Sequence, residues 1–241
     1  MLDSLMQNFQ NIDIQGIVIL VFAACISLSF HEMSHAWRAY KLGDDTAQRA
    51  GRLTMNPLAH LDPFGTLMII FARVGWAKPV PMNPVLFTRA KTMKRGIVEV
   101  SLAGPLSNML LAVISYFLLR ITELIYILIY GTTQIANPTS PVITIFVSLF
   151  SLMYILNINL ALFNLLPVPP LDGFKIFGSM LPNNLYYKLM DYERYIGIVF
   201  LLIVIFSGGA IGLILQTISI PFKFIIETPL DFIFNSIYKL L

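Results

Sequence analysis

His31, Glu32 and His35 form an HExxH pattern, the set of side chains in this sequence with the clearest chemical meaning. Two histidines four residues apart lie on one face of a helix, one turn apart, so both imidazoles can bind the same metal ion. Zn²⁺ sites of hydrolytic enzymes use this spacing, and the glutamate beside the first histidine acts as a general base. The pattern therefore predicts zinc-assisted hydrolysis, with two histidine ligands and Glu32 as the base.

The position of the pattern is unusual, because it directly follows residues 16–30, which carry no charge. Ionisable side chains within a membrane segment are costly to bury and are usually functional. The alternative is a pair of surface histidines just beyond the membrane boundary. Two of the three histidines in the chain fall within the pattern, which favours the metal site over that alternative.

Composition places the chain among integral membrane proteins. Of its 241 residues, 57% are hydrophobic and only 12% are charged, and the mean hydropathy is +0.76. Soluble domains carry about 25% charged residues. The net charge of +3 is too small to indicate a nucleic-acid partner. A single cysteine, Cys25, excludes both an internal disulfide and a zinc site built from cysteines.

Four apolar segments predict an all-α polytopic membrane protein, because each reaches the roughly 20 residues needed to span the hydrocarbon core. They cover about residues 14–40, 96–130, 141–166 and 195–220. We expect one membrane-embedded domain over residues 1–241. Its three-helix catalytic core would lie at about 14–180, and a C-terminal helix with an amphipathic tail at about 195–241.

Two further segments are too short or too polar to span. Within the polar stretch 41–95, the apolar run 63–74 predicts either a re-entrant or interfacial segment or a β-hairpin. After Pro221, apolar and charged residues alternate in a pattern typical of an amphipathic helix on the membrane surface.

Basic residues are distributed unevenly over the connecting segments, which predicts the orientation of the chain. Residues 41–95 hold nine Lys and Arg against three acidic residues, whereas residues 131–140 hold none. Residues 167–194 contain further Lys and Arg. We therefore expect the N-terminus outside and both basic segments in the cytoplasm.

A catalytic zinc ion keeps three protein ligands and an open position for water, so a third ligand is required. Asp172 lies in residues 164–173, Asn-Leu-Leu-Pro-Val-Pro-Pro-Leu-Asp-Gly, where the third span ends on the same predicted side as His35. The prolines prevent a regular helix, and exposed backbone is tolerated at membrane depth only inside protein or beside water. An isolated Asp-Gly pair would indicate an ordinary turn, but this context favours Asp172 as the third ligand.

Together the two motifs resemble those of the site-2 protease family of intramembrane zinc metalloproteases. That family pairs HExxH on one transmembrane helix with N-x-x-P-x-x-x-L-D-G on another, and residues 30–35 and 164–173 match these patterns. The resemblance implies one zinc ion per chain and a complete site: the ligands His31, His35 and Asp172, the base Glu32, and Asn164 as a polar side chain that steadies the oxyanion.

The resemblance extends over about residues 16–180. Residues 103–108 are similar to an A-G-P-x-x-N element of the family, and residues 51–65 and 75–81 are similar to loops of its small bacterial members. Nothing resembles the PDZ or CBS domains of larger relatives. The resemblance thus implies a minimal, multi-pass protease of a bacterial plasma membrane, with its active site towards the cytoplasm.

Several polar residues have roles that the sequence leaves open. As a fourth ligand His60 would close the zinc site, so we expect a loop hydrogen bond or a place in a substrate groove. Asn108 could bond backbone inside the helix bundle or assist near the zinc, since amides between membrane helices are common packing contacts. Asn157 and Asn159 belong to the same class.

The predicted reaction is hydrolysis of a peptide bond in or near a transmembrane segment of another membrane protein, close to the cytoplasmic face. Zinc would lower the pKa of its bound water to about 7, and Glu32 would accept the proton. The substrate helix must unwind, and the run 63–74 could hold it as an added strand if it offered a strand edge. The partners would be membrane proteins and the lipid bilayer, with the oligomeric state open.

Two alternatives remain. A metal transporter would use histidine and aspartate as transit ligands, but it predicts several sites along a path. A catalytically inactive relative would bind membrane helices without cutting them, but it should lack Glu32 or one of the ligands, and all are present.

Overall fold

The protein is almost entirely helical in a computed structural model. The structure describes residues 14–72, 75–131, 140–207 and 209–239. Within these ranges it contains no β-strand, and the β pairing there is one isolated antiparallel bridge between Leu61 and Ala77. The predicted all-α class is confirmed.

Within the described ranges, four helices are long and apolar enough to cross a membrane. They are α2 (Ile14–Leu42), α5 (Met93–Tyr130), α6 (Pro141–Asn164) and α10 (Ala210–Tyr238). The shorter helices are α3 (Thr46–Arg49), α4 (Pro63–Ala72), α7 (Asp172–Gly178), α8 (Asn183–Asp191) and α9 (Glu193–Phe206), with 3-10 turns η1 (Pro57–Ala59) and η2 (Pro84–Leu86). The chain is thus a multi-pass membrane protein with four candidate spans, as the sequence predicts.

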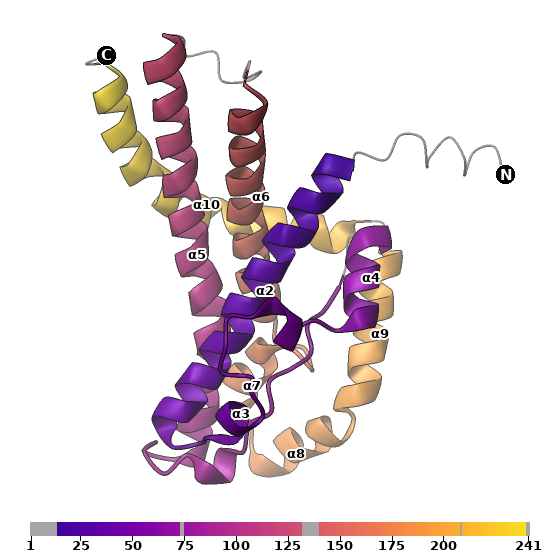
Figure 1. Ribbon diagram of the computed structural model, residues 1–241. Coiled ribbons are helices and arrows are strands. Elements are labelled where there is room, and N and C mark those ends of the chain that lie inside the picture. The colour runs from indigo at the N-terminus through magenta and orange to yellow at the C-terminus, as the bar shows by residue number, and fades with distance from the viewer. Residues whose placement is uncertain (1–13, 73–74, 132–139, 208, 240–241) are drawn as a thin grey trace, which may run out of the picture.

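The helices α2, α5 and α6 form the centre of the molecule and make its most extensive helix–helix contacts (Figure 1). On α2 the buried positions include small residues such as Ala23, Ser27, Ala36 and Ala39. Small side chains allow membrane helices to approach closely. This close packing brings the HExxH segment of α2 against α5 and against the end of α6.

The apolar run after the first span is a helix and not a hairpin. The side chain of Asp62 accepts a hydrogen bond from Gly65 N–H at 2.8 Å, and Pro63 occupies the first helical position. Such a cap followed by proline favours the start of a helix. With ten residues α4 is about 15 Å long, too short to span. The hairpin alternative is therefore wrong for residues 63–72. Being helical, these residues also offer no strand edge to which an extended substrate could pair. Residues 73–74 lie outside the described part.

The C-terminal part departs from its predicted boundaries. The apolar segment 195–220 is divided, because α9 ends at Phe206 and Gly209 begins α10 with a left-handed φ of +91°. Pro221 lies inside α10, so the tail predicted to rest on the membrane surface continues the fourth long helix. Figure 1 shows that α10 is bent and that its last part runs beside α5, as expected for a helix with internal prolines.

Candidate metal centre

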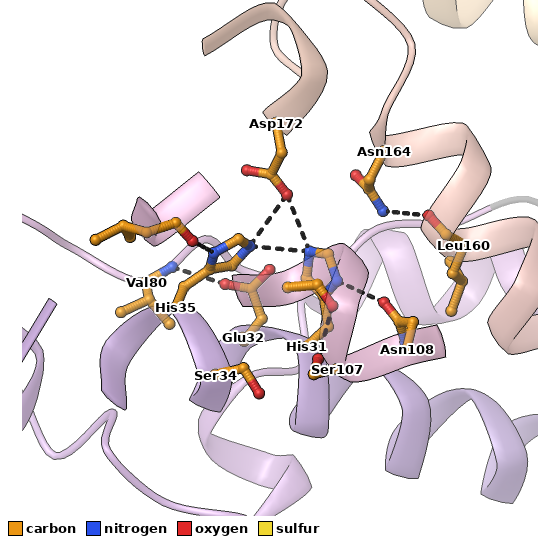
Figure 2. Close-up of polar contacts among 12 residues, drawn as sticks. His31, Glu32, Ser34, His35, Val80, Ser107, Asn108, Leu160, Asn164 and Asp172 are labelled. Carbon is orange, nitrogen blue, oxygen red and sulfur yellow. Dashed lines mark hydrogen bonds and ion pairs between the residues drawn. The ribbon is translucent and has the colours of Figure 1, made fainter. Parts of the chain in front are cut away.

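Two helical segments that are far apart in the sequence bring three metal-binding side chains together. His31 Nε2 and His35 Nε2, on α2, lie 3.3 and 3.1 Å from Asp172 Oδ2 at the start of α7. The two Nε2 atoms are 3.0 Å apart. Figure 2 shows the three side chains converging on one point, and all three are buried.

This cluster fits a zinc ion. Donor atoms placed tetrahedrally at 2.0–2.1 Å from Zn²⁺ lie about 3.3 Å from one another, close to the separations found between His31, His35 and Asp172. Among the described residues, this is the one group of three His, Cys, Asp or Glu side chains whose atoms all lie close enough to hold a metal ion. Three converging lone pairs inside the protein repel one another unless a cation or protons lie between them.

The carboxyl group of Asp172 is held in the form that binds a metal ion. Burial by itself would raise its pKa, but without a metal ion the attraction and hydrogen bonding of the imidazoles of His35 and His31, when these are protonated, outweigh burial and hold the pKa well below its usual range. Metal ligands must be deprotonated. The environment of Asp172 therefore favours the ionised ligand at neutral pH.

Two glycines allow the backbone to close around the cluster. A Cβ on Gly104 of α5 would lie 2.4 Å from His35 Nε2 and 2.5 Å from His31 Cε1, so α5 can pass beneath both rings only without a side chain there. A Cβ on Gly173 would lie 2.3 Å from the carbonyl oxygen of Leu165. Gly173 thus permits the turn that carries Asp172 back from the end of α6 towards the histidines.

The Nδ1 nitrogen of each histidine, on the side of the ring away from Asp172, has its own partner on α5. His35 Nδ1 lies 2.7 Å from the carbonyl oxygen of Val100, and His31 Nδ1 lies 2.6 Å from Asn108 Oδ1. The Nε2 atoms of both rings consequently face Asp172 (Figure 2). Asn108 makes both of the contacts considered in the sequence, because its Oδ1 faces a predicted ligand and its Nδ2 donates to the backbone carbonyl of Ser27 at 3.3 Å.

Glu32 points towards the same space but is held by a loop. Its Oε2 accepts a hydrogen bond of 3.0 Å from the backbone N–H of Val80, as Figure 2 shows. The guanidinium of Arg52 donates to the carbonyl oxygen of Lys78, whose own N–H donates to His60 O at 2.8 Å. The segments 51–65 and 75–81 therefore come together and present one backbone N–H to the predicted base.

Two other residues considered in the sequence lie outside the cluster. The His60 ring is buried in the loop, where its Nε2 lies 2.8 Å from Thr54 O, so the expected loop hydrogen bond is confirmed. Asn164, at the end of α6, donates from Nδ2 to Leu160 O at 2.9 Å, as Figure 2 shows. Asn164 is therefore not one of the three clustered side chains.

An apolar cavity of about 630 Å³ lies next to the cluster, between α2, α6, α9 and α10. Its lining includes Leu28 of α2, Phe163 of α6, Gly197 of α9 and Leu215 of α10. Leu171, which precedes the metal-binding Asp172, also lines it. The cavity therefore meets the site at Leu171, although His31, His35 and Asp172 do not themselves line it.

Sequence reasoning missed the contributions of the backbone. The sequence cannot indicate the Val80 N–H or the Val100 carbonyl as part of the site, since every residue other than proline offers the same two backbone groups. Gly104 and Asn108 stood within a recognised motif, but the motif alone says nothing about which side chains they meet. Asn157 is grouped with Asn108 by the sequence, but its contact with Asn108 follows only from the packing of α6 against α5.

Comparison with known proteins agrees with the geometry. The model of peptidase family M50 matches residues 18–205. A Bacillus subtilis protein named "Putative zinc metalloprotease YwhC" is 42% identical over 191 residues, which cover 79% of this chain and 82% of the relative. A Mycolicibacterium smegmatis protein named in the same way, Rip2, is 33% identical over 70% of this chain and 58% of its own length. No solved structure matches the chain.

Proposed function

Because the chain belongs to peptidase family M50, the site-2 protease family, and is a zinc metalloprotease with membrane helices, we propose that it cleaves transmembrane segments of other membrane proteins. The observation that carries this proposal is the depth of the cluster. His31 lies eleven residues before the end of α2 at Leu42, about 16 Å along the helix. In this proposal that distance places the side chains within the spanning part of α2, so the peptide bond to be cut comes to them inside the helix bundle.

In this proposal His31, His35 and Asp172 hold the zinc ion. When bound there, the ion supplies a Lewis acid and a water molecule of lowered pKa. Water can approach because the chain around residues 167–171 is not helical and the stretch 41–95, which includes the loop bonded to Glu32, is polar overall. With three protein ligands, the site would leave a position open for that water.

Glu32 acts as the general base. Its Oε2 is occupied by the Val80 N–H, which leaves Oε1 to accept the proton from water. The same carboxyl group then returns the proton to the nitrogen of the departing amine, so the base is regenerated. Asn164 assists the oxyanion: its amide has two N–H groups, and only one is used by Leu160 O.

The substrate class follows from the apolar cavity. Its lining by Leu28, Phe163 and Leu171 suits the aliphatic and aromatic side chains of a transmembrane segment. The bulk of the substrate would lie between α2, α6, α9 and α10, with its unwound portion beside Asp172. The cavity, at about 630 Å³, has room for several such side chains.

The charge distribution supports a cytoplasmic orientation of the site. The basic segment 41–95, which contacts Glu32, and residues 167–194, which contain Asp172, are both expected in the cytoplasm. Since the relatives come from bacteria, we propose the bacterial plasma membrane as the location.

The test compares wild-type protein with Glu32→Gln in detergent or liposomes. Both should contain zinc, since Glu32 is not among the three clustered ligands, but cleavage of a model membrane substrate should fall by about 10²–10⁴-fold. Zinc content and cleavage are measured on the same preparations. A soluble unfolded peptide serves as a second substrate.

The outcomes separate the alternatives. Cleavage that survives in Glu32→Gln would contradict the base. Cleavage of the soluble peptide with none of the membrane substrate would leave a metalloprotease without the intramembrane role. Zinc bound by a wild-type protein that cuts neither substrate would favour the inactive relative, and zinc passage across liposomes would favour the transporter.

A further inference from the structure

The buried amide of Asn108 can have only one orientation. Its Oδ1 lies 2.6 Å from His31 Nδ1, and its Nδ2 donates to the backbone carbonyl of Ser27 at 3.3 Å and to Asn157 Oδ1 at 2.7 Å. A carbonyl oxygen only accepts hydrogen bonds. The NH₂ end of Asn108 must therefore face α2 and α6, and its oxygen must face the histidine.

The same reasoning fixes the second amide. Asn157 Nδ2 donates to the Met153 carbonyl at 2.7 Å and to Ser27 Oγ at 2.8 Å. Because the Met153 carbonyl can only accept, the oxygen of Asn157 must face Asn108. Ser27, Asn108 and Asn157 are all buried, and the two amides have no exposed surface, so no water competes for these bonds.

These orientations determine where the proton of neutral His31 lies. An imidazole nitrogen facing an amide oxygen must donate, so Nδ1 carries the proton and Nε2 keeps its lone pair. That lone pair points at Asp172 and His35. The same tautomer follows for neutral His35 from a single contact, because its Nδ1 faces the backbone carbonyl of Val100, which can only accept a hydrogen bond.

We propose that Ser27, Asn108 and Asn157 are positioning residues that hold His31 in the Nδ1-protonated tautomer, so that its Nε2 is always available to the zinc ion. The inference rests on the proposed zinc site. It adds a relay across three helices, from the Met153 carbonyl on α6 through two amides to a ligand on α2. Outer partners of this kind typically change metal affinity by about 10–100-fold.

The decisive variant is Asn157→Leu, because Asn157 acts on His31 only through Asn108. Without the acceptor on α6, Asn108 keeps only the 3.3 Å contact to Ser27 O and can rotate. A rotated amide presents NH₂ to His31 Nδ1, which moves the ring proton to Nε2 and blocks the ligand. Zinc affinity, measured by competition with a chelator, should fall by about 10–100-fold.

Two further variants separate positioning from packing. Asn159→Leu changes the same residue type on the same helix, where Asn159 lines the cavity and takes no part in the relay, and it should leave zinc affinity unchanged. In the double variant Asn108→Asp/Asn157→Leu the carboxylate offers only acceptors to His31 Nδ1, so zinc affinity should recover. A packing role predicts that the double variant binds zinc no better than Asn157→Leu.

The tautomer can be observed without proteolysis. The chain contains three histidines, so ¹⁵N NMR of histidine-labelled, zinc-free protein at alkaline pH gives three ring systems to assign. We expect the Nδ1-protonated tautomer for His31 and His35 in the wild type. In Asn157→Leu the His31 signals should shift towards Nε2 protonation, and those of His35 should not change.

Wild-type His31 protonated on Nε2 would overturn the inference, even if Asn157→Leu failed to fold. Unchanged tautomer and zinc affinity in a folded Asn157→Leu protein would overturn it as well. Failure of the wild-type protein to cleave the membrane substrate would instead count against the proposed function. The two failures are therefore distinguishable.

Discussion

Two clusters of polar side chains join the long helices, and they differ in charge and in burial. The cluster behind His31 consists of a hydroxyl and two amides that are fully buried. The other lies on α5 around Arg120, sixteen residues beyond Gly104 and about 24 Å along the helix. There Arg120 contacts Glu123 at 2.6 Å and Asp231 of α10 at 3.3 Å, with these side chains partly exposed.

The comparison shows what each kind of contact can do. Amides have a donor end and an acceptor end, so a closed set of them specifies direction and can select one tautomer of a neighbouring histidine. Charged groups attract without such direction. The charged cluster anchors a helix: Tyr116 donates to Asp231 at 2.6 Å and Tyr154 donates to Glu227 at 2.8 Å, which ties α10 to α5 and α6.

The largest effect should separate the metal-binding side chains, which the amide cluster supports, from the charged cluster. Asp172→Ala removes one of three converging donors, so zinc affinity should fall by more than the roughly 100-fold that marks the upper range for outer partners. Asp231→Ala is the matched control in the charged cluster and should keep its zinc while unfolding at a lower temperature. Zinc content and thermal unfolding of both variants check this; loss of zinc from Asp231→Ala would contradict the division.

A smaller effect is expected where the backbone of α5 meets the rings. Gly104→Ala places a methyl group 2.4 Å from His35 Nε2, and overpacking typically costs about 1–3 kcal/mol. A cost in the lower part of that range, about 1.4 kcal/mol, corresponds to a loss of about tenfold in zinc affinity. Gly212→Ala in α10 is the control, because nothing lies within 4 Å of its added Cβ. Equal zinc affinity in the two variants would show that α5 shifts to make room for the methyl group and that the histidines keep their positions.

The smallest effect concerns the charged cluster alone. Tyr116→Phe removes the hydroxyl that bonds Asp231, and a hydrogen bond to a charged group contributes about 1.5–3 kcal/mol. Partial exposure of Asp231 should bring the loss in unfolding free energy to about 1 kcal/mol. Thermal unfolding in detergent measures it, and zinc affinity should stay unchanged. A drop in zinc affinity would mean that the two clusters are coupled along α5.

Much of the fold and of the site could be predicted, and the misses have physical causes. Long apolar runs indicate helices wherever they occur, so the first three spans were found to within a few residues. The fourth was misplaced for two reasons. Gly209, with its left-handed φ, separates α9 from α10 locally, and the tyrosines that pair with Glu227 and Asp231 hold α10 through tertiary contacts. The helix α4 was left undecided, since a short apolar run suits both a helix and a strand.

The sequence by itself determined the identity and spacing of the reactive groups. Helix geometry places His31 and His35 on one face, and the proline-rich segment before Asp172 indicates a third ligand. Only the tertiary structure decided how these groups are oriented. The Val80 N–H on Glu32, the Val100 carbonyl on His35 and the amide of Asn157 behind Asn108 come from segments distant in the chain. Backbone groups are chemically alike at nearly every residue, so only the packing of the helices selects which of them orients a given side chain.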